Sequence, residues 1–390
     1  MAISPQRLLL LSISLSVAYN LLAAISWGET SRGLAVPAKV SSPEASTNQF
    51  SGCLLLMDDN HFLIEWLAYH YHVLNLRHVI VAIDPRSKTS PRPILNRWAN
   101  RMNITVWAND EDFEPNSTAF DEAESWVRIK FKSDDPSPEL IRHRARQRLF
   151  YFHCLQEHKR AHHKWTLLTD TDEFLLLNYQ TIAKDRPEEE APQSIFSPGS
   201  VANFLRSEEA KHPESVAARP CLQIPRWRFG TVDHTVRYPP GPFNATDFTT
   251  LRWLYHASST NYQFNRISKT IIDVSRVDWT DLVPVDSIHR PLRQYCGQRK
   301  LHIESKDQYL LIHHYLGSWE QYSFRQDARE GKERSQQMYR KTAKLAEEYS
   351  QDIVPWLGGF IRENGIESAQ FLLSDAGKTT PRPRSPLPTK

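Results

Sequence analysis

Hydrophobic positions along the first half of the chain alternate between strand-like runs and longer segments with helical spacing. In the first helical segment, Phe62, Trp66, Tyr69 and Val73 recur every three or four residues, which predicts a core-facing side. Asn60 precedes this segment and is a good N-cap. The predicted strands cover residues 53–57, 78–83, 105–108 and a run that ends at Asp170, and the predicted helices cover residues 61–75 and 139–162. This order predicts an α/β fold with an open, mostly parallel central sheet flanked by helices.

The second half of the chain has a less regular pattern. A polar stretch with several prolines, residues 180–215, contains a predicted helix over residues 200–211. Later strands are predicted over residues 220–229, 269–274 and 309–313, and a charged, mostly helical segment over residues 320–349. Residues 378–390 contain four prolines and no core-forming pattern, which predicts a disordered tail. The folded domain is therefore expected to cover residues 52–373.

The N-terminal end predicts a membrane anchor. After a short cytoplasmic tail over residues 1–7, residues 8–27 form an uncharged, mostly apolar run. The run is close to the roughly 20 residues that a membrane-spanning helix needs. Residues 23–26 resemble a cleavage region, so a signal peptide is the alternative, but the length of the run favours an uncleaved signal anchor. Residues 28–50, rich in Ser, Ala, Pro and Thr, are typical of a stem.

Two further features favour a domain on the lumenal side of a secretory membrane. N-glycosylation acceptor patterns begin at Asn103, Asn116 and Asn244. The chain also has four cysteines, an even number that is compatible with two disulfides: Cys53, Cys154, Cys221 and Cys296. The sequence leaves three pairings open, and free buried thiols are the alternative.

The strongest chemical signal is the acidic interruption of an apolar stretch. Asp170 and Asp172 follow a strand-like run, and Glu173 leads directly into a second apolar run over residues 174–177. A buried strand cannot hide three carboxylates without a partner. Asp170 and Asp172 are hard oxygen ligands that can share one Mg²⁺ or Mn²⁺, which keeps open positions for phosphate oxygens. The alternative is a solvated turn, but the apolar flanks on both sides argue against it.

Acidic residues also follow the other predicted strands. Asp58 and Asp59 come after the first strand and Asp84 after the second. In open α/β sheets, ligands gather beyond the carboxyl ends of the strands. Asp58 and Asp84 are therefore expected to bind a nucleotide, with Asp84 accepting hydrogen bonds from uridine or ribose hydroxyls.

The predicted helix before Asp170 carries a basic stretch. Arg144 and Gln147 on this helix are expected to reach the phosphates of a bound nucleotide, by bidentate contact in the case of the arginine. A solvated basic face is the alternative. Farther along, His158, His162 and His163 cluster near the end of the helix, where no glutamate stands between them as in zinc hydrolases. This cluster is interpreted as a solvated helix end.

Ordered segments of the chain resemble glycosyltransferase family 92, a group once catalogued as a domain of unknown function. The segments are Glu-Trp-Leu-Ala-Tyr-His at 65–70, a strand ending in an acid at 79–84, the Asp-Thr-Asp-Glu-Phe signature within 164–175, Ile-Pro-Arg-Trp-Arg-Phe-Gly at 224–230, Lys-Thr-Ile at 269–271, and His-His-Tyr with Ser-Trp-Glu within 313–320. Together they extend over nearly the whole predicted domain. The Asn-Glu pair that usually follows the family's first strand is replaced here by residues 58–61.

The resemblance implies a GT-A nucleotide-sugar fold and a metal-dependent, inverting glycosyltransferase. Several family members use UDP-galactose, so transfer of galactose to a glycan acceptor is expected. Mn²⁺ or Mg²⁺ held by Asp170 and Asp172 would bridge the donor diphosphate, and His313 or His314 would supply a further ligand. A carboxylate would take the proton of the acceptor hydroxyl, and the candidates are Asp247, Asp233 and Glu173.

Two other classes of protein stay open on the sequence. A metal-dependent phosphohydrolase would use the same acids with further metal ligands, and a catalytically silent carbohydrate-binding ectodomain would have no turnover. The net charge of +3 does not indicate binding to nucleic acid. A single-pass type II protein of the Golgi or another secretory membrane is expected, and the sequence leaves the oligomeric state open.

Overall fold

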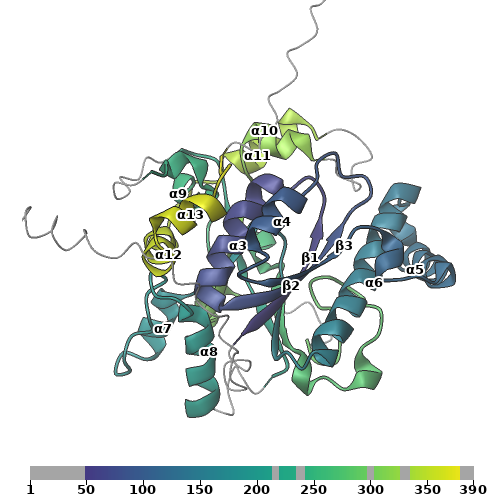
Figure 1. The fold of residues 1–390 in the computed structure, drawn as a ribbon, viewed down its shortest axis with the longest axis horizontal. Helices are drawn as coiled ribbons and strands as arrows, with labels where there is room; N and C mark the ends of the chain where they lie inside the picture. Colours follow the sequence, from purple (N-terminus) through teal and green to yellow (C-terminus); the bar gives the residue numbers. More distant parts are fainter. Residues whose placement is uncertain (1–48, 213–218, 234–241, 297–302, 326–333, 378–390) are drawn as a thin grey trace, which may run out of the picture. The chain divides into compact units, whose positions relative to one another are not determined.

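The computed structural model describes residues 49–212, 219–233, 242–296, 303–325 and 334–377, all within one compact unit of the chain. Two sheets organise these residues (Figure 1). The first has the order β3 (Asn103–Trp107), β2 (Leu76–Ile83), β1 (Phe50–Leu56), β4 (Trp165–Leu168), β9 (Lys269–Asp273) and β6 (Cys221–Ile224). The second has the order β11 (Glu348–Tyr349), β8 (Tyr255–His256), β7 (Arg226–Phe229), β10 (Leu310–Tyr315) and β5 (Glu173–Leu177).

The first sheet confirms the predicted α/β class. Strands β1 to β4 run parallel to one another, and β9 is antiparallel to its neighbours β4 and β6. In the second sheet, β10 is parallel to β7 and antiparallel to β5. The strands that precede Asp84 and Asp170, β2 and β4, therefore point the same way, and their carboxyl ends meet at one edge.

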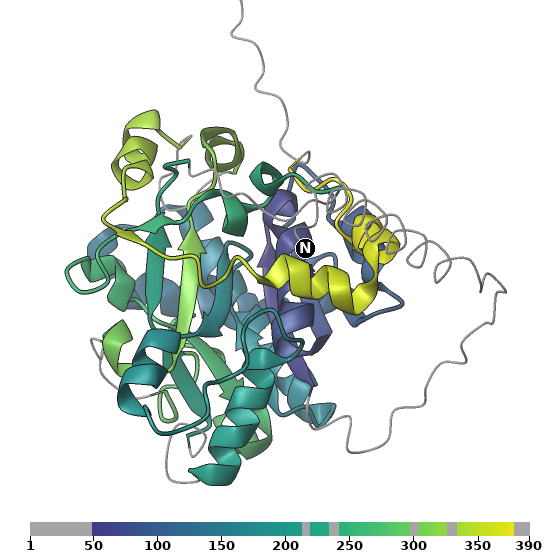
Figure 2. The same ribbon diagram turned by 90° about the vertical axis from the view of Figure 1, so that its left-hand side faces the viewer.

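Helices cover both faces of the first sheet (Figure 1). The α-helices of the described residues are α3 (Asn60–Leu74), α4 (Arg92–Trp98), α5 (Ser117–Lys130), α6 (Pro138–Arg160), α7 (Tyr179–Asp185), α8 (Ser200–Lys211), α9 (Thr249–Arg252), α10 (Trp319–Phe324), α11 (Gln336–Ala343), α12 (Trp356–Asn364) and α13 (Ile366–Leu372). Helices α5 and α6 pack on the face opposite α3, α4 and α12. Figure 2 shows α12 and α13, in yellow, beside the purple α3.

The alternation of side chains along the strands separates two hydrophobic cores. On β2, Val79 and Val81 belong to the core under α3, whereas Ile80 and Ala82 belong to the core under α5 and α6. The same division occurs on β4, where Leu167 faces one core and Leu168 the other. Strands that are buried on both faces read as continuous apolar runs, which is why the sequence pattern identified them.

The first predicted helix is confirmed to within one residue at each end. Phe62, Trp66 and Tyr69 are completely buried, but so is nearly every other residue of α3, so the helix has no solvent-facing side. The prediction that Asn60 is the N-cap is wrong. Asp59 occupies that position without a side-chain cap bond, and the Asn60 amide instead donates to the Ser90 carbonyl at 3.1 Å.

The predicted strand over residues 220–229 is two strands in different sheets. Pro225 separates β6 from β7, and it has no N–H to donate to a ladder. Its carbonyl still accepts a hydrogen bond from Ile312 N at 3.0 Å. The chain therefore crosses from the first sheet to the second at Pro225, which delivers Arg226 and Arg228 to the second sheet.

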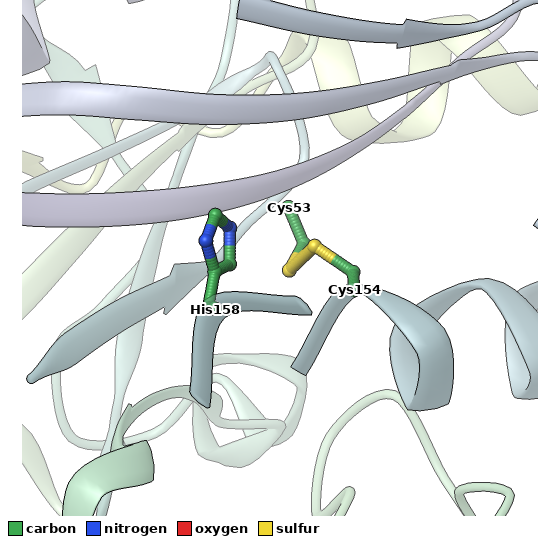
Figure 3. Close-up of side chains that lie close together, drawn as sticks. All are labelled: Cys53, Cys154 and His158. Carbon is green, nitrogen blue, oxygen red and sulfur yellow. A yellow bond between two sulfur atoms is a disulfide. The ribbon is translucent and has the colours of Figure 1, made fainter. Parts of the chain in front are cut away.

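Two disulfides select one of the three possible pairings. They join Cys53 with Cys154 and Cys221 with Cys296. The first links β1 to α6 and lies beside His158 (Figure 3). Although Cys53, Cys154 and His158 are close enough to share a metal ion, the disulfide leaves no thiolate to bind one.

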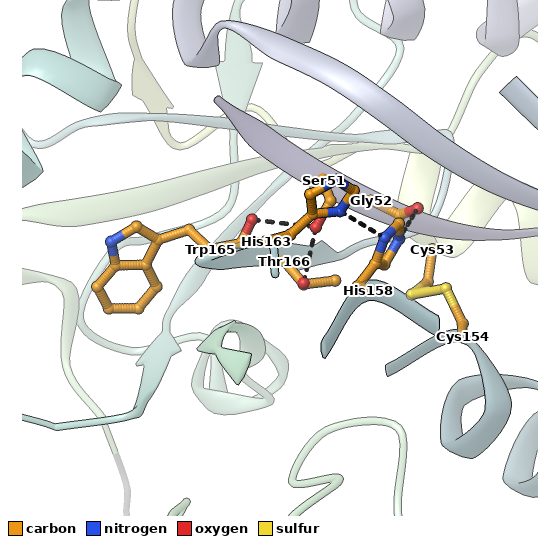
Figure 4. Close-up of a disulfide and its surroundings, with 8 residues drawn as sticks. All are labelled: Ser51, Gly52, Cys53, Cys154, His158, His163, Trp165 and Thr166. Atoms are coloured by element: carbon orange, nitrogen blue, oxygen red, sulfur yellow. Dashed lines mark hydrogen bonds between the residues drawn. A yellow bond between two sulfur atoms is a disulfide. The ribbon is translucent and has the colours of Figure 1, made fainter. Parts of the chain in front are cut away.

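The histidine cluster on α6 is not the solvated helix end that the sequence predicts. His158 is buried, and its Nε2 donates to the Gly52 carbonyl at 3.1 Å (Figure 4). Its Nδ1 must then accept a hydrogen bond from His163 Nδ1 at 3.0 Å. Burial is the largest cause that lowers the pKa of His158 to about 3. The pair therefore fastens the end of α6 to β1, whereas His162 is exposed.

Several predicted segments fall outside the described residues. Residues 1–48, which contain the predicted cytoplasmic tail, anchor and most of the stem, are among them, as is the tail over residues 378–390. Within the described part of the chain, no helix is both long and apolar enough to cross a membrane. The segment predicted as mostly helical over residues 320–349 contains α11 and most of α10, and ends in the short strand β11.

Candidate active site

A cavity of about 850 Å³ opens at the carboxyl ends of the strands. Six of the residues singled out from the sequence line it: Asp84, Arg144, Gln147, Asp170, Asp172 and His314. The cavity is within the range of volumes that protein pockets for small molecules and cofactors occupy. The sequence therefore identified much of one real cavity, although Asp58, Glu173, Asp233, Asp247 and His313 are not on its lining.

The acidic turn lies where the two sheets meet. β4 ends at Leu168 in the first sheet and β5 begins at Glu173 in the second, so Asp170 and Asp172 stand between the sheets. The Asp170 side chain is 48 % exposed, whereas that of Asp172 is only 8 % exposed. Glu173 is fully buried, and its Oε2 accepts a hydrogen bond from Asp170 N at 2.9 Å. The turn thus presents one solvated and one enclosed carboxylate to the cavity.

Two basic residues that the sequence reasoning did not assign neutralise these acids. Lys269 Nζ donates to Asp170 Oδ2 at 2.8 Å and lies 3.1 Å from Glu173 Oε2. Arg226 Nη1 donates to Glu173 Oε1 at 2.7 Å. Burial would lower the pKa of Lys269, but Asp170 and Glu173 outweigh burial and raise it. Glu173 is therefore a brace between β5, β7 and β9, and it does not line the cavity.

Asp172 sits in a second charged group that includes Arg325, His314 and Asp59. Arg325 Nη2 donates to Asp172 Oδ2 at 3.2 Å and Arg325 Nη1 to Asp59 Oδ1 at 2.7 Å. His314 Nε2 lies 3.7 Å from Asp172 Oδ2. Burial would raise the pKa of Asp172, but His314 and Arg325 outweigh burial and lower it. Burial is also the main reason that the pKa of Asp59 is raised to about 6.

The two neighbouring histidines of β10 have separate environments. Successive side chains of a strand point to opposite faces, and His314 faces the cavity. His313 lies in an aromatic cluster, with ring centroids 4.4 Å from Phe229 and 5.8 Å from Trp227. Burial lowers the pKa of His313 well below its ordinary range. The structure therefore brings His314, but not His313, to Asp172.

The residues present fit a divalent cation beside Asp172. Its Oδ1 is buried and has no hydrogen-bond partner among the described residues. Ligand atoms of Asp172, Glu173 and His314 lie within 4.8 Å of one another. Since Glu173 is engaged by Arg226 and Lys269, the candidate ligands that a cation can reach from the cavity are Asp172, His314 and the partly exposed Asp170. Carboxylate and imidazole ligands of this kind suit Mn²⁺ or Mg²⁺.

Asp84 has a different role from the predicted one. Its Oδ1 accepts hydrogen bonds from Arg86 N at 3.0 Å and Arg86 Nε at 2.9 Å. Its Oδ2 accepts from Arg86 Nη2 at 2.8 Å and Arg146 Nη1 at 3.0 Å. A carboxylate has about four acceptor sites, and these bonds occupy all of them. In this arrangement Asp84 cannot also accept a bond from a ribose hydroxyl, so it orients the arginines.

Arg146 on α6 is a buried residue that the sequence reasoning missed. In addition to Asp84, it contacts Asp110 through Nε at 2.6 Å and Nη2 at 2.9 Å. It therefore ties α6 to the end of β2. Arg144, two residues earlier, lines the cavity with its guanidinium 3.9 Å from the Phe131 ring, and Gln147 also lines the cavity.

Three of the predicted acids lie away from the cavity lining. Asp58 is buried and accepts hydrogen bonds from Lys88 N at 2.7 Å and Thr89 N at 3.0 Å, so it orders the loop after β2. Asp233 is largely exposed and is held by Arg252 Nε at 2.6 Å. Asp247 is exposed at the end of a 3₁₀ turn. The structure brings neither Asp233 nor Asp247 together with Asp170.

Comparisons with known proteins do not identify a family for this chain. No protein-family model and no curated protein match the sequence. The crystal structure of S. aureus TarS 1-349 in complex with UDP-GlcNAc aligns with a TM-score of 0.33 at 12 % identity, over 85 % of this chain and 82 % of that chain. A second crystal structure of S. aureus TarS 1-349 gives a TM-score of 0.28 at 11 % identity, over 81 % and 74 %. Structural similarities this weak support no conclusion about fold or function.

Proposed function

We propose that the protein is a metal-dependent glycosyltransferase that moves a sugar from a nucleotide donor to a glycan acceptor. The observation that carries the proposal is the buried Asp172 Oδ1, which has no partner among the described residues and belongs to a side chain that lines a cavity of about 850 Å³. Asp170 and His314 line the same cavity. A cation bound there would neutralise the diphosphate of the departing nucleotide.

The residues of the chain have distinct roles in this proposal. Asp172 and His314 would hold the cation, and the partly exposed Asp170 would be a further ligand. Arg325 already neutralises Asp172 and lines the cavity, so it is placed to contact phosphate oxygens once a ligand enters. Arg144 and Gln147 approach the donor from α6.

The proton acceptor for the attacking hydroxyl is proposed to be Asp59. Asp233 and Asp247 are not on the cavity lining, and Glu173 is buried between two basic side chains. Asp59 does line the cavity, and its pKa, raised to about 6 mainly by burial, suits a group that accepts a proton near neutral pH. Inversion at the anomeric carbon requires such a base opposite the leaving diphosphate.

The finer points of the proposal come from the sequence. Galactose from UDP-galactose is the donor that the family resemblance favours. A single-pass type II location in the Golgi or another secretory membrane follows from the apolar run over residues 8–27. Two disulfides and three exposed N-glycosylation acceptors support a lumenal domain: Asn103, Asn116 and Asn244.

The test is a turnover screen of the purified full-length chain with Mn²⁺ against a panel of nucleotide sugars, with and without oligosaccharide acceptors. We expect one donor to be consumed, faster with an acceptor, with UDP released. Release of phosphate from nucleotides without sugar transfer would favour a phosphohydrolase. No turnover of any donor together with no UDP binding would refute the transferase and leave a carbohydrate-binding ectodomain.

A further inference from the structure

Arg228 is a cavity-lining cation on the second sheet. It pairs in register with His314, which pairs in turn with Glu173 on the next strand. Because facing residues of neighbouring strands share a side of the sheet, Arg228 and His314 both face the cavity. The side chain of Trp227, between Arg226 and Arg228, stacks instead on His313 and His256 on the opposite side.

The guanidinium of Arg228 differs from its neighbours in having no anionic partner. Arg226 is paired with Glu173 at 2.7 Å and Arg325 with Asp59 at 2.7 Å. Within the residues that the structure describes, no carboxylate lies within 4.0 Å of the Arg228 side chain, and its Nε is buried without a hydrogen bond. Burial first, and then the neighbouring Arg226, lower the pKa of Arg228.

An arginine held in this way is prepared for an anion from outside the chain. Enclosing a guanidinium without a counter-ion is unfavourable, and a ligand oxyanion removes that penalty. The planar fork of arginine matches the two oxygens of a carboxylate or a phosphate. The backbone of Arg228 is fixed meanwhile, since its N–H donates to Asn265 Oδ1 at 3.0 Å. This bond fixes the point from which the Arg228 side chain extends into the cavity.

Arg228 and Asp84 lie on opposite sides of the acidic turn. Asp84 follows β2, which is two strands from β4 in the first sheet, whereas Arg228 is on β7, two strands from β5 in the second. The acidic turn lies between them. Phe264 is 42 % exposed, its ring is 5.7 Å from the Arg228 guanidinium, and its centroid is 5.4 Å from that of Tyr262. The exposed ring of Phe264 is a surface on which a sugar ring can stack.

We propose that Arg228 is the anchor of an oxyanion subsite on the far side of the acidic turn from Asp84. The subsite takes a carboxylate, phosphate or sulfate group, and Phe264 supports the sugar that carries it. This inference rests on the proposed function in assigning the oxyanion to a transferase substrate. The oxyanion belongs either to an acidic acceptor sugar or to the donor diphosphate, and the two sources differ in what Arg228→Gln changes.

The test compares wild type, Arg228→Gln and Arg228→Lys by isothermal titration calorimetry. The probes are inorganic phosphate, glucuronic acid, and UDP with Mn²⁺; glucuronic acid is titrated both alone and in the presence of UDP and Mn²⁺. Arg92→Gln, which removes an exposed arginine on α4, is the control for a change in net charge. Circular dichroism and thermal unfolding confirm that each variant is folded, and Arg228→Lys retains the charge if the glutamine variant unfolds.

We expect Arg228→Gln to weaken phosphate or glucuronic acid binding by roughly tenfold or more, with Arg228→Lys less affected and Arg92→Gln unchanged. Unchanged UDP binding would assign the oxyanion to the acceptor, and weakened UDP binding would assign it to the donor. Binding of all three probes by Arg228→Gln as tightly as by wild type would overturn the subsite. If Arg228→Gln weakens phosphate binding but wild type does not bind UDP at all, the proposed function fails while the subsite stands.

Discussion

Replacing Lys269 with methionine tests the charge network that supports the acidic turn. The Lys269 side chain is 1 % exposed, and its Nζ contacts both Asp170 at 2.8 Å and Glu173 at 3.1 Å. Methionine keeps much of the length and apolar volume of the side chain but removes the ammonium group. The fully buried carboxylate of Glu173 then loses one of its two cationic partners.

The expected loss of stability follows from the burial of each partner. Removing one member of a buried ion pair costs about 3–5 kcal/mol. Glu173 retains Arg226 at 2.7 Å and Asp170 N at 2.9 Å, so the lower end of this range, about 3 kcal/mol, applies. Asp170 is 48 % exposed, so its own bond to Lys269 adds no more than about 1 kcal/mol.

The assay is urea unfolding with the disulfides intact, analysed by linear extrapolation. Asp170→Asn is the matched control, because it removes the exposed half of the interaction and leaves Lys269 with Glu173. We expect this control to lose less than about 1 kcal/mol. A loss below about 1 kcal/mol for Lys269→Met, or an equal loss for both variants, would contradict the assignment of Glu173 and Lys269 as the buried brace.

Three further predictions concern neighbouring residues. Arg325→Gln should tighten Mn²⁺ binding by about tenfold in calorimetry, since Arg325 competes for Asp172 Oδ2 at 3.2 Å; unchanged or weaker binding would argue against that competition. Arg146→Leu should lower the free energy of unfolding by about 3 kcal/mol because two buried acids lose a partner, whereas Arg144→Leu should lose less than about 1 kcal/mol; equal losses would refute this. The pKa of Asp59 is raised from 3.8 to about 6, so its contribution to stability, fully present below pH 3.8, should fall as pH rises to about 6, and Asp59→Asn should abolish this pH dependence in urea titrations.

The pattern of apolar residues predicted the elements whose formation depends on neighbouring residues in the sequence. The continuous apolar runs of β1, β2 and β4 and the spacing in α3 and α6 require burial wherever the chain goes, so the sequence revealed them. The break at Pro225 was also readable, because proline cannot donate to a ladder. The prediction of a single strand there gave the apolar pattern more weight than the missing N–H.

Contacts between residues far apart in the sequence decide the two points that the sequence left open, the histidine at the site and the disulfide pairing. His313 and His314 have the same chemistry, and only the register of β10 with β5 and β7 decides which one faces the cavity. The disulfide pairing likewise depends on the position of α6 beside β1. These relations join residues far apart in sequence, and spacing alone cannot supply them.

The sequence indicated the acidic residues of the site but not the basic residues that neutralise them. Lys269 and Arg226 each begin a short, largely buried strand, and a buried cation is a signal that a carboxylate lies near. Asp233 and Asp247 are proton-acceptor candidates that follow from the family resemblance, and neither lines the cavity. Asp59, next to Asp58, was named only as part of a strand end, although it is the one of the pair that lines the cavity.

The most direct test of the account is calorimetric titration of UDP into wild type and Asp172→Asn, each with Mn²⁺ and with EDTA. Wild type should bind UDP in the presence of Mn²⁺ and lose that binding in EDTA, and Asp172→Asn should bind more than about tenfold more weakly with the metal present. UDP binding that is equal with Mn²⁺ and EDTA, or equal in the two proteins, would contradict a metal-assisted nucleotide site at Asp172.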